Sequence, residues 1–277
     1  MKVGEKTDTT VIEAKRGWVV LDLAEILRYR DLIYFLVWRD IKVRYKQTVL
    51  GVAWAVIQPF MTMVVFSIIF GHWVKMPSEG YPYPLFVYSA LLPWTFFANA
   101  ITTSGGSVVG SSNLITKVYF PRLIIPMASI GAGIVDFLIS FAVMLGMMVY
   151  YQVSWHASLV AVPFLFLAVM FTALGVGTFL SALIVAYRDF RYLIPFMMQL
   201  WMYLTPVIYS PTLFPEKWRW IFNLNPMVGL IGGFRSAFLG QAFDKTGFLM
   251  SFAVSILIFF AGVCYFKQVE RGFADVI

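Results

Sequence analysis

The chain changes character between residues 38–46, WRDIKVRYK, and residues 52–72, VAWAVIQPFMTMVVFSIIFGH. The first stretch is dense in Lys and Arg. The second lacks Lys, Arg, Asp and Glu, and it is long enough to cross a bilayer, which takes about 20 residues. Ten of the 21 Lys and Arg residues of the chain lie at or before Lys46. Because basic flanks of membrane segments stay in the cytoplasm, the N-terminus is expected on that side.

Composition places the whole chain among integral membrane proteins. It has 277 residues, of which 60% are hydrophobic and only 13% charged, whereas a soluble domain has about 25% charged residues. The net charge of +7 lies mainly beside membrane segments, so it favours anionic lipid and protein docking over nucleic acid. The single cysteine, Cys264, excludes an intramolecular disulfide and a Cys/His metal site. Residues 1–30 lack the apolar core of a cleavable signal peptide.

The apolar runs predict an all-α fold with six transmembrane helices. The expected spans are 52–72, 84–101, 123–151, 157–187, 193–209 and 249–266. The third and fourth are longer than a bilayer requires, so they are expected to tilt, kink or project beyond it. The fifth is short and contains Pro195 and Pro206, which makes it the weakest of the six.

The distribution of charge supports an even number of spans. With both termini inside, 16 basic residues are cytoplasmic and five are external. The cytoplasmic set is the ten N-terminal residues with Lys117, Arg122, Arg188, Arg191, Lys267 and Arg271, and the external set is Lys75, Lys217, Arg219, Arg235 and Lys245. This bias predicts a multi-pass protein of the bacterial inner membrane with both termini cytoplasmic. The expected organisation is a tail over 1–30, an interface helix over 31–50 and a six-span domain over 51–277.

Residues 31–46 have the pattern of an amphipathic helix that lies along the cytoplasmic leaflet. One face carries Tyr34, Val37, Trp38, Ile41 and Tyr45, and the roughly opposite face carries Arg39, Lys42 and Lys46. An aromatic face combined with a basic face is typical of an interfacial helix. The alternative is a basic flank of the first span without defined helical structure.

Two loops carry further helical signals. Between spans two and three, Ser112 or Asn113 is expected to cap a short cytoplasmic helix that Pro121 ends, and this helix is a candidate docking element. Gly106 and Gly110 form a GxxxG pattern, which alone is weak evidence for helix contact. In the loop 210–248, two apolar stretches are too short to span. They are expected to form short external, re-entrant helices that dip into the outer leaflet, the alternative being a seventh and eighth span.

The polar chemistry of the chain is sparse. It contains no Ser-His-Asp arrangement, paired carboxylates or Walker A motif, so no enzymatic activity and no bound cofactor is expected. Asp136 is the single acid deep in a predicted span, and such groups are candidates for function. The nearby Gly131 and Gly133 equally favour a carboxylate held at a close helix contact. Pro59 kinks the first span, as a gate hinge or as a static bend.

Aromatic residues make up 18% of the chain. Most are expected in interfacial belts. Some are candidates to line a path for a sugar, because sugar rings pack against aromatic faces while Tyr and Trp keep a hydrogen-bonding edge. The residues selected for such a path are Trp54, Trp201, Tyr203 and Tyr209.

Several blocks, in this order and spacing, resemble the permeases of polysaccharide ABC exporters of the ABC-2 type, the family that exports O-antigen, teichoic acid and capsule. The blocks are YRDL (29–32), WRDIKVRYKQT (38–48), LG (50–51), FPR (120–122), YRDFRY (187–192), LTPVIY (204–209), NPM (225–227) and FR (234–235), together with Trp54 and Pro59. The resemblance covers roughly residues 25–270. One departure is Gly232-Gly233, where many members carry an acid just before the Phe-Arg pair.

The resemblance implies a homodimer of six-span permeases that works with two separate ATPase subunits, which bind ATP and Mg. It implies that the N-terminal helix, at Arg39, Lys42 and Lys46, contacts those ATPases. The same is implied for the loop after span two, with Asn113, Leu114, Lys117 and Tyr119. It further implies outward movement of a lipid-linked, undecaprenyl-carried polysaccharide, with O-antigen ahead of teichoic acid or capsule. The competing hypotheses are a secondary transporter that uses Asp136, and a membrane glycosyltransferase or acyltransferase.

Overall fold

The computed structural model describes residues 23–46, 51–213 and 215–273, and every regular element in these ranges is a helix. The predicted all-α fold is therefore confirmed for the described part of the chain. Residues 1–22 of the predicted tail, residues 47–50 of the predicted interface helix and residues 274–277 lie outside these ranges.

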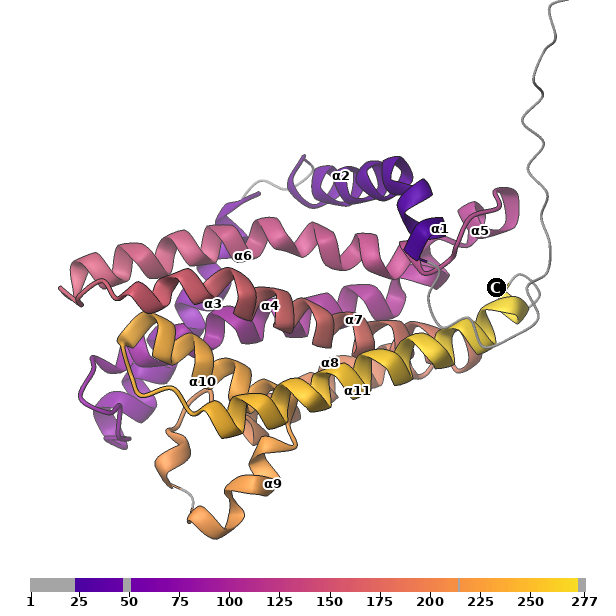
Figure 1. Ribbon diagram of the computed structural model, residues 1–277. Helices are drawn as coiled ribbons and strands as arrows, with labels where there is room; N and C mark the ends of the chain where they lie inside the picture. Colours follow the sequence, from indigo (N-terminus) through magenta and orange to yellow (C-terminus); the bar gives the residue numbers. More distant parts are fainter. Residues whose placement is uncertain (1–22, 47–50, 214, 274–277) are drawn as a thin grey trace, which may run out of the picture.

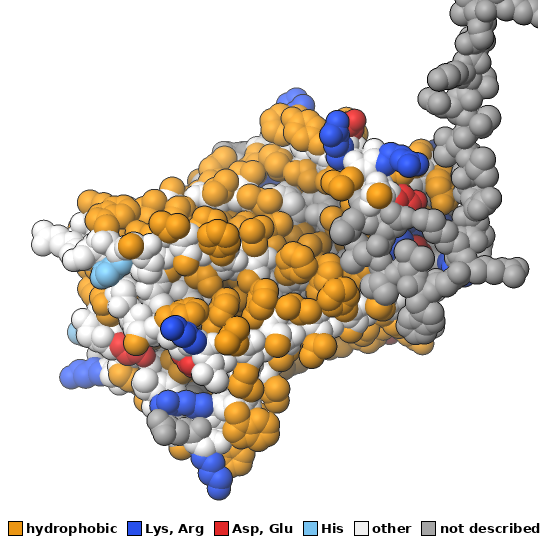
Figure 2. Space-filling view, in the orientation of Figure 1, with side chains coloured by type: hydrophobic (Ala, Val, Ile, Leu, Met, Phe, Trp, Pro, Cys, Tyr) orange, Lys and Arg blue, Asp and Glu red, His pale blue; other side chains and the backbone are white. Residues whose placement is uncertain are grey.

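Five helices are long and apolar enough to cross a membrane. They are Ala53–Trp73 (α3 with the π-helix η1), Tyr83–Gly110 (α4), Ile124–Tyr150 (α6), Ala157–Ala186 (the 3-10 helix η2 with α7) and Lys245–Gly272 (α11 with the 3-10 helix η5). They lie side by side in an elongated bundle (Figure 1). Figure 2 shows hydrophobic side chains over the flank of the bundle, with the charged side chains toward its two ends. This distribution suits a protein whose flank contacts lipid.

Shorter helices complete the fold. They are α1 (Leu23–Arg28), α2 (Arg30–Lys46), α5 (Ser112–Lys117), α8 (Phe190–Leu204), α9 (Arg219–Asn223) and α10 (Pro226–Leu239). The predicted helix over 31–46 is thus present as α2, which packs along α6 (Figure 1). The predicted cap of α5 at Ser112 or Asn113 is wrong, since the helix follows Ser111 and has no side-chain cap.

Helix α4 is the centre of the bundle and packs against α3, α6, α7, α8 and α10. It continues to Gly110, well beyond the predicted end of the second span at residue 101. Its last turns carry Thr102, Thr103 and Ser107, each of which donates its hydroxyl to a carbonyl one turn earlier in α4. Hydroxyls satisfied in this way let a helix continue through a polar stretch at membrane depth.

Small residues bring α7 and α11 into close contact. A Cβ added at Gly175 of α7 would lie 2.6 Å from the Cα atom of Phe259 in α11, and one at Gly262 would lie 2.1 Å from the carbonyl oxygen of Gly175. Nearby, the Thr172 hydroxyl donates to the Ser255 hydroxyl at 2.9 Å. Small residues and interhelical hydroxyl bonds are the usual means by which helices associate in lipid. The predicted GxxxG pair is not used in this way, since nothing lies within 4 Å of a Cβ added at Gly106 or Gly110.

The fifth predicted span corresponds to α8, which has 15 residues, fewer than a bilayer crossing requires. The chain nevertheless runs beside α4 from one end of that helix to the other. A Cβ added at Gly105, near the end of α4, would lie 3.0 Å from Ile194. At the start of α4, the Tyr83 hydroxyl donates to the carbonyl of Ile208 at 2.7 Å. Helix α8 and the turn residues after it together connect the two ends of the bundle.

The loop 210–248 contains two short helices, α9 and α10, where short helices were expected. The N-cap of α10 is Asn225, whose side chain accepts a hydrogen bond from the Met227 N–H at 3.1 Å, and Gly240 follows its end with a φ of 66°. Both are the residue types that these positions favour. Helix α10 is buried against α4, α7 and α11, so protein covers its backbone.

Candidate functional site

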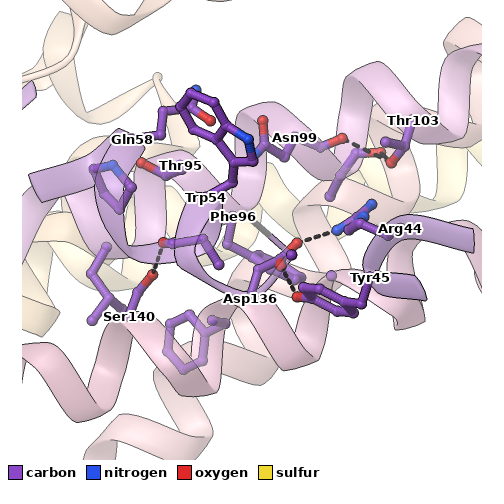
Figure 3. Close-up of a pocket in the computed structure, with 17 residues that line it drawn as sticks. Arg44, Tyr45, Trp54, Gln58, Thr95, Phe96, Asn99, Thr103, Asp136 and Ser140 are labelled. Atoms are coloured by element: carbon purple, nitrogen blue, oxygen red, sulfur yellow. Dashed lines mark hydrogen bonds and ion pairs between the residues drawn. The ribbon is translucent and has the colours of Figure 1, made fainter. Parts of the chain in front are cut away.

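A cavity of about 340 Å³ lies between the end of α2 and helices α3, α4 and α6 (Figure 3). Helix α4 lines it with Thr95, Asn99 and Thr103, which follow one another at four-residue steps and therefore share one face. Helix α3 contributes Trp54 and Gln58 at the same spacing. A second cavity of about 560 Å³ lies between α2, α4 and α6, and Arg44 and Thr103 line both. The polar face of α4 thus continues from one cavity into the other.

The predicted intramembrane acid, Asp136 of α6, lies in the wall of the first cavity and is fully engaged. Arg44 forms an ion pair with one of its carboxylate oxygens, and the Tyr45 hydroxyl donates to the other. Figure 3 shows both side chains reaching Asp136 from the end of α2. Burial, followed by the hydrogen bond to Asp136, raises the pKa of the Tyr45 phenol above its usual range. The phenol therefore remains a donor, and the cluster fixes α2 to α6.

Close helix packing surrounds this cluster, as the neighbouring glycines indicated. A Cβ added at Gly131 would lie 3.1 Å from Val37 of α2, and one at Gly133 would lie 3.3 Å from Phe96 of α4. On α2, the side that packs on protein contains Ile33, Leu36 and Val37. The predicted aromatic face is divided between two surroundings. Its members Val37 and Tyr45 pack on α6, whereas Tyr34 and Trp38 are exposed.

The predicted hinge, Pro59, lies in the interior of α3 and lines the cavity. Proline has no N–H, so the carbonyl four residues earlier loses its partner in the helix. That carbonyl belongs to Ala55, and it accepts a hydrogen bond from the Ser140 hydroxyl of α6 at 3.3 Å. The bond ties α3 to α6 at the proline.

The residues selected for a substrate path lie in different surroundings. Trp54 is 54% exposed and faces the cavity, and Tyr203 is 48% exposed on α8. Trp201 packs edge-on against Trp94 and Phe97 and donates its indole N–H to the Asn225 side chain at 3.0 Å. The Tyr209 hydroxyl donates to the carbonyl of Tyr203 at 3.1 Å. Trp54 is therefore the member of this set that lines the cavity.

The residues selected for ATPase coupling lie at the surface. Arg39 forms an ion pair with the adjacent Asp40 at 2.8 Å, and Lys42 lies 5.3 Å from the ring centre of Trp38. Lys46 is exposed at the end of α2. In and after α5, Asn113, Lys117 and Tyr119 are exposed, while Leu114 packs against buried residues. Arg39 lines the second cavity together with Gly110 and Ser111, at the junction of α4 and α5.

Arg235 of α10, which the charge count places among the external basic residues, is buried. Its side chain is 2% exposed. Its guanidinium donates to the carbonyl of Val207 at 2.9 Å and that of Tyr209 at 3.4 Å, and its central carbon lies 3.8 Å from the ring centre of Phe86. Arg235 therefore anchors the segment after α8 to α4 and α10. No feature of the sequence alone distinguishes this arginine from an exposed one.

A bundle of long apolar helices, with a polar cavity beside a basic surface helix, is the architecture of a multi-pass membrane protein. Residues 31–239 match the ABC-2 type transporter family, and the chain belongs to that family. The O-antigen export system permease protein RfbA of Myxococcus xanthus is 30% identical over 91% of this chain and 98% of its own length. RfbA of Klebsiella pneumoniae is 26% identical over 89% of this chain and 95% of its own length. The inner membrane transport permease YadH of Escherichia coli K12 is 28% identical over 78% of this chain and 87% of its own length.

These findings establish the broad assignment. The relatives are transport permeases, which are not enzymes, and permeases of the ABC-2 type work with ATPase partners in ABC exporters. The apolar helices and the relatives together indicate a multi-pass protein of the inner membrane. The expected family is thus confirmed.

Proposed function

We propose that this chain is the permease subunit of an ATP-driven exporter that moves undecaprenyl-linked polysaccharide, with O-antigen as the first choice, across the inner membrane. The observation that carries this proposal is the match to O-antigen export permeases over about nine-tenths of the chain and nearly all of theirs. Teichoic acid and capsular polymers are the alternatives within the same class.

The state of Asp136 weighs against the competing class of secondary transporter. An acid that carries protons across a membrane must be free to exchange them with both sides. Both oxygens of Asp136 are instead engaged, by Arg44 and by Tyr45. In the proposed mechanism Asp136 holds α2 on the bundle, and a separate ATPase that binds ATP and Mg supplies the energy for transport.

The proposed assembly is a homodimer with two ATPase subunits. The span formed by α3 and η1 is a candidate surface for the second copy or for lipid, because it exposes Met61, Val65 and Ile68. The proposed contacts for the ATPases are Arg39, Lys42 and Lys46 of α2 and Asn113, Leu114, Lys117 and Tyr119 in and after α5.

Deletion of the gene tests the proposed function. Surface polysaccharide should disappear on gels and in antibody staining, and finished lipid-linked polymer should accumulate inside the cell, since synthesis is separate from export. Expression of the intact chain in the deletion strain is the control and should restore both. Normal surface polysaccharide in the deletion strain, with no internal polymer, would refute the proposal and favour a small-molecule exporter.

Cysteine labelling tests the proposed orientation, in which both termini are cytoplasmic and six crossings include α8. In a Cys264→Ser background, cysteines introduced by Lys217→Cys and Lys245→Cys should react with an impermeant maleimide in intact spheroplasts. A cysteine introduced by Lys117→Cys should react only after permeabilisation. Labelling of the latter from outside would contradict the six-crossing topology.

A further inference from the structure

Two side-chain amides in the wall of the first cavity have no partner within the described residues. Gln58 of α3 and Asn99 of α4 both line it, and their side chains make no hydrogen bond with any described residue. A side-chain amide carries two N–H donors and a carbonyl acceptor. Hydrocarbon can satisfy none of these groups. The two amides are therefore available to a polar occupant of the cavity.

An aromatic face lies beside the amides. Trp54 is one helical turn before Gln58 on the same face of α3, and it is half exposed. Thr95 is likewise one turn before Asn99 on α4. Figure 3 shows Gln58, Trp54 and Asn99 next to one another, away from the Arg44–Asp136 pair. An aromatic ring with polar side chains beside it can bind a molecule that has both C–H faces and hydroxyl groups.

The charged residues of the cavity favour a neutral ligand over an ionic one. Among its lining residues, Arg44 and Asp136 are the charged ones, and they form an ion pair with each other. The wall near the amides therefore offers hydrogen bonds without net charge. A neutral, hydroxyl-rich ligand matches this wall better than a phosphate or a carboxylate does. The volume of about 340 Å³ lies within the range of small-ligand sites.

We infer that Gln58, Asn99 and Trp54 form a subsite that binds a sugar residue of the transported polymer, with the indole against the ring and the amides on its hydroxyls. The inference rests on the proposed function and deepens it, because it assigns the sugar contact to the wall between α3 and α4. It moves that contact away from Trp201, whose indole N–H is bonded to Asn225.

The first experiment removes the amides in cells. The double variant Gln58→Leu/Asn99→Leu keeps similar side-chain size and loses two hydrogen-bonding groups, and each is expected to lower export by about threefold. Surface polysaccharide should therefore fall by about tenfold while polymer accumulates inside. The matched control is Thr102→Val, which removes a hydroxyl from α4 outside the cavity and should leave export unchanged. The amide-retaining variant Gln58→Asn should keep most of the export if folding is intact.

The second experiment identifies the occupant directly. Thr95→p-benzoylphenylalanine places a photoreactive group in the cavity, and light should attach glycan to the permease, visible as a periodate-stained and antibody-reactive smear. The same group at Thr102 should give no such product. Normal export by Gln58→Leu/Asn99→Leu, or a light-induced adduct solely with a second copy of the chain, would overturn the subsite. Because the deletion strain tests export itself, a deletion that loses surface glycan beside a fully active double variant would refute only this inference.

Discussion

The ion pair between Arg44 and Asp136 provides a quantitative test of how α2 is held on the bundle. Asp136→Asn keeps the shape of the side chain and an oxygen that accepts from Tyr45, so it removes mainly the charge. Removing one partner of a fully buried pair costs about 3–5 kcal/mol. Here the Arg44 and Asp136 side chains are 32% and 21% exposed, and solvent screens part of the interaction. We expect Asp136→Asn to lower the free energy of unfolding by about 2 kcal/mol.

A double-mutant cycle separates the pair from other effects of the substitution. The cycle combines Asp136→Asn with Arg44→Met, and unfolding is followed by circular dichroism as SDS is titrated into detergent micelles. The expected coupling energy is about 1–2 kcal/mol. The matched control is the neighbouring pair on the same helix, Arg39 and Asp40, whose side chains are 44% and 28% exposed. The coupling of this more exposed pair should stay below about 1 kcal/mol.

Two results would refute the structural role assigned to Asp136. The first is additivity of the two substitutions within about 0.5 kcal/mol, which would mean that the charges do not interact. The second concerns export. If Asp136 holds α2, the double variant Arg44→Met/Asp136→Leu, which leaves no unpaired charge, should export better than either single variant. Complete loss of transport whenever the carboxylate is missing would instead favour a proton-coupled mechanism.

Three further results are expected. Because burial and Asp136 raise the pKa of Tyr45, its contact should stabilise the fold fully at neutral pH. Its contribution should decline as pH rises above about 10, the ordinary phenol value, where the unfolded chain loses its proton first; unfolding titrations against Tyr45→Phe measure this. Ser140→Ala leaves the Ala55 carbonyl unpaired and should cost about 1 kcal/mol in the same titration, and no loss would mean that this contact is unimportant. Reversing Arg39 and Lys42 to Glu should abolish export with membrane insertion intact, and normal export would exclude an essential docking role.

Hydropathy predicted the long helices well, but it misplaced the end of a helix that has one polar and one apolar face. It placed the end of the second span at residue 101 because Thr102, Thr103 and Ser107 lower the average of that stretch. The helix continues to Gly110, since these hydroxyls are bonded to its own backbone and part of this polar face lines the cavities. A window average assumes lipid on every side of a helix, whereas α4 has protein around most of it.

The candidate site was less accessible to sequence reasoning, because contacts between distant residues create it. Arg44 and Asp136 are separated by 92 positions, and nothing in either local sequence specifies the pairing. The sequence identified Asp136 as the unusual group and its glycines as close contacts, but could not decide between proton carrier and structural anchor. Arg235 is a second residue whose surroundings depend on contacts between distant parts of the chain. It was counted among the external basic residues, whereas its side chain lies in the core and donates to the carbonyls of Val207 and Tyr209.

The hydrogen-bond partners of the polar side chains in the bundle bear on the source of energy for transport. Asp136 is paired with Arg44, and the Thr172 hydroxyl is bonded to Ser255, so these groups are occupied in holding helices together. The amides of Gln58 and Asn99, by contrast, face the cavity without a partner among the described residues. A carrier driven by protons needs a titratable group that is free in the path, whereas a carrier driven by ATP hydrolysis on another subunit needs only groups that bind its cargo weakly and release it. Neutral amides beside an indole meet the second requirement, and a carboxylate held by a guanidinium does not meet the first.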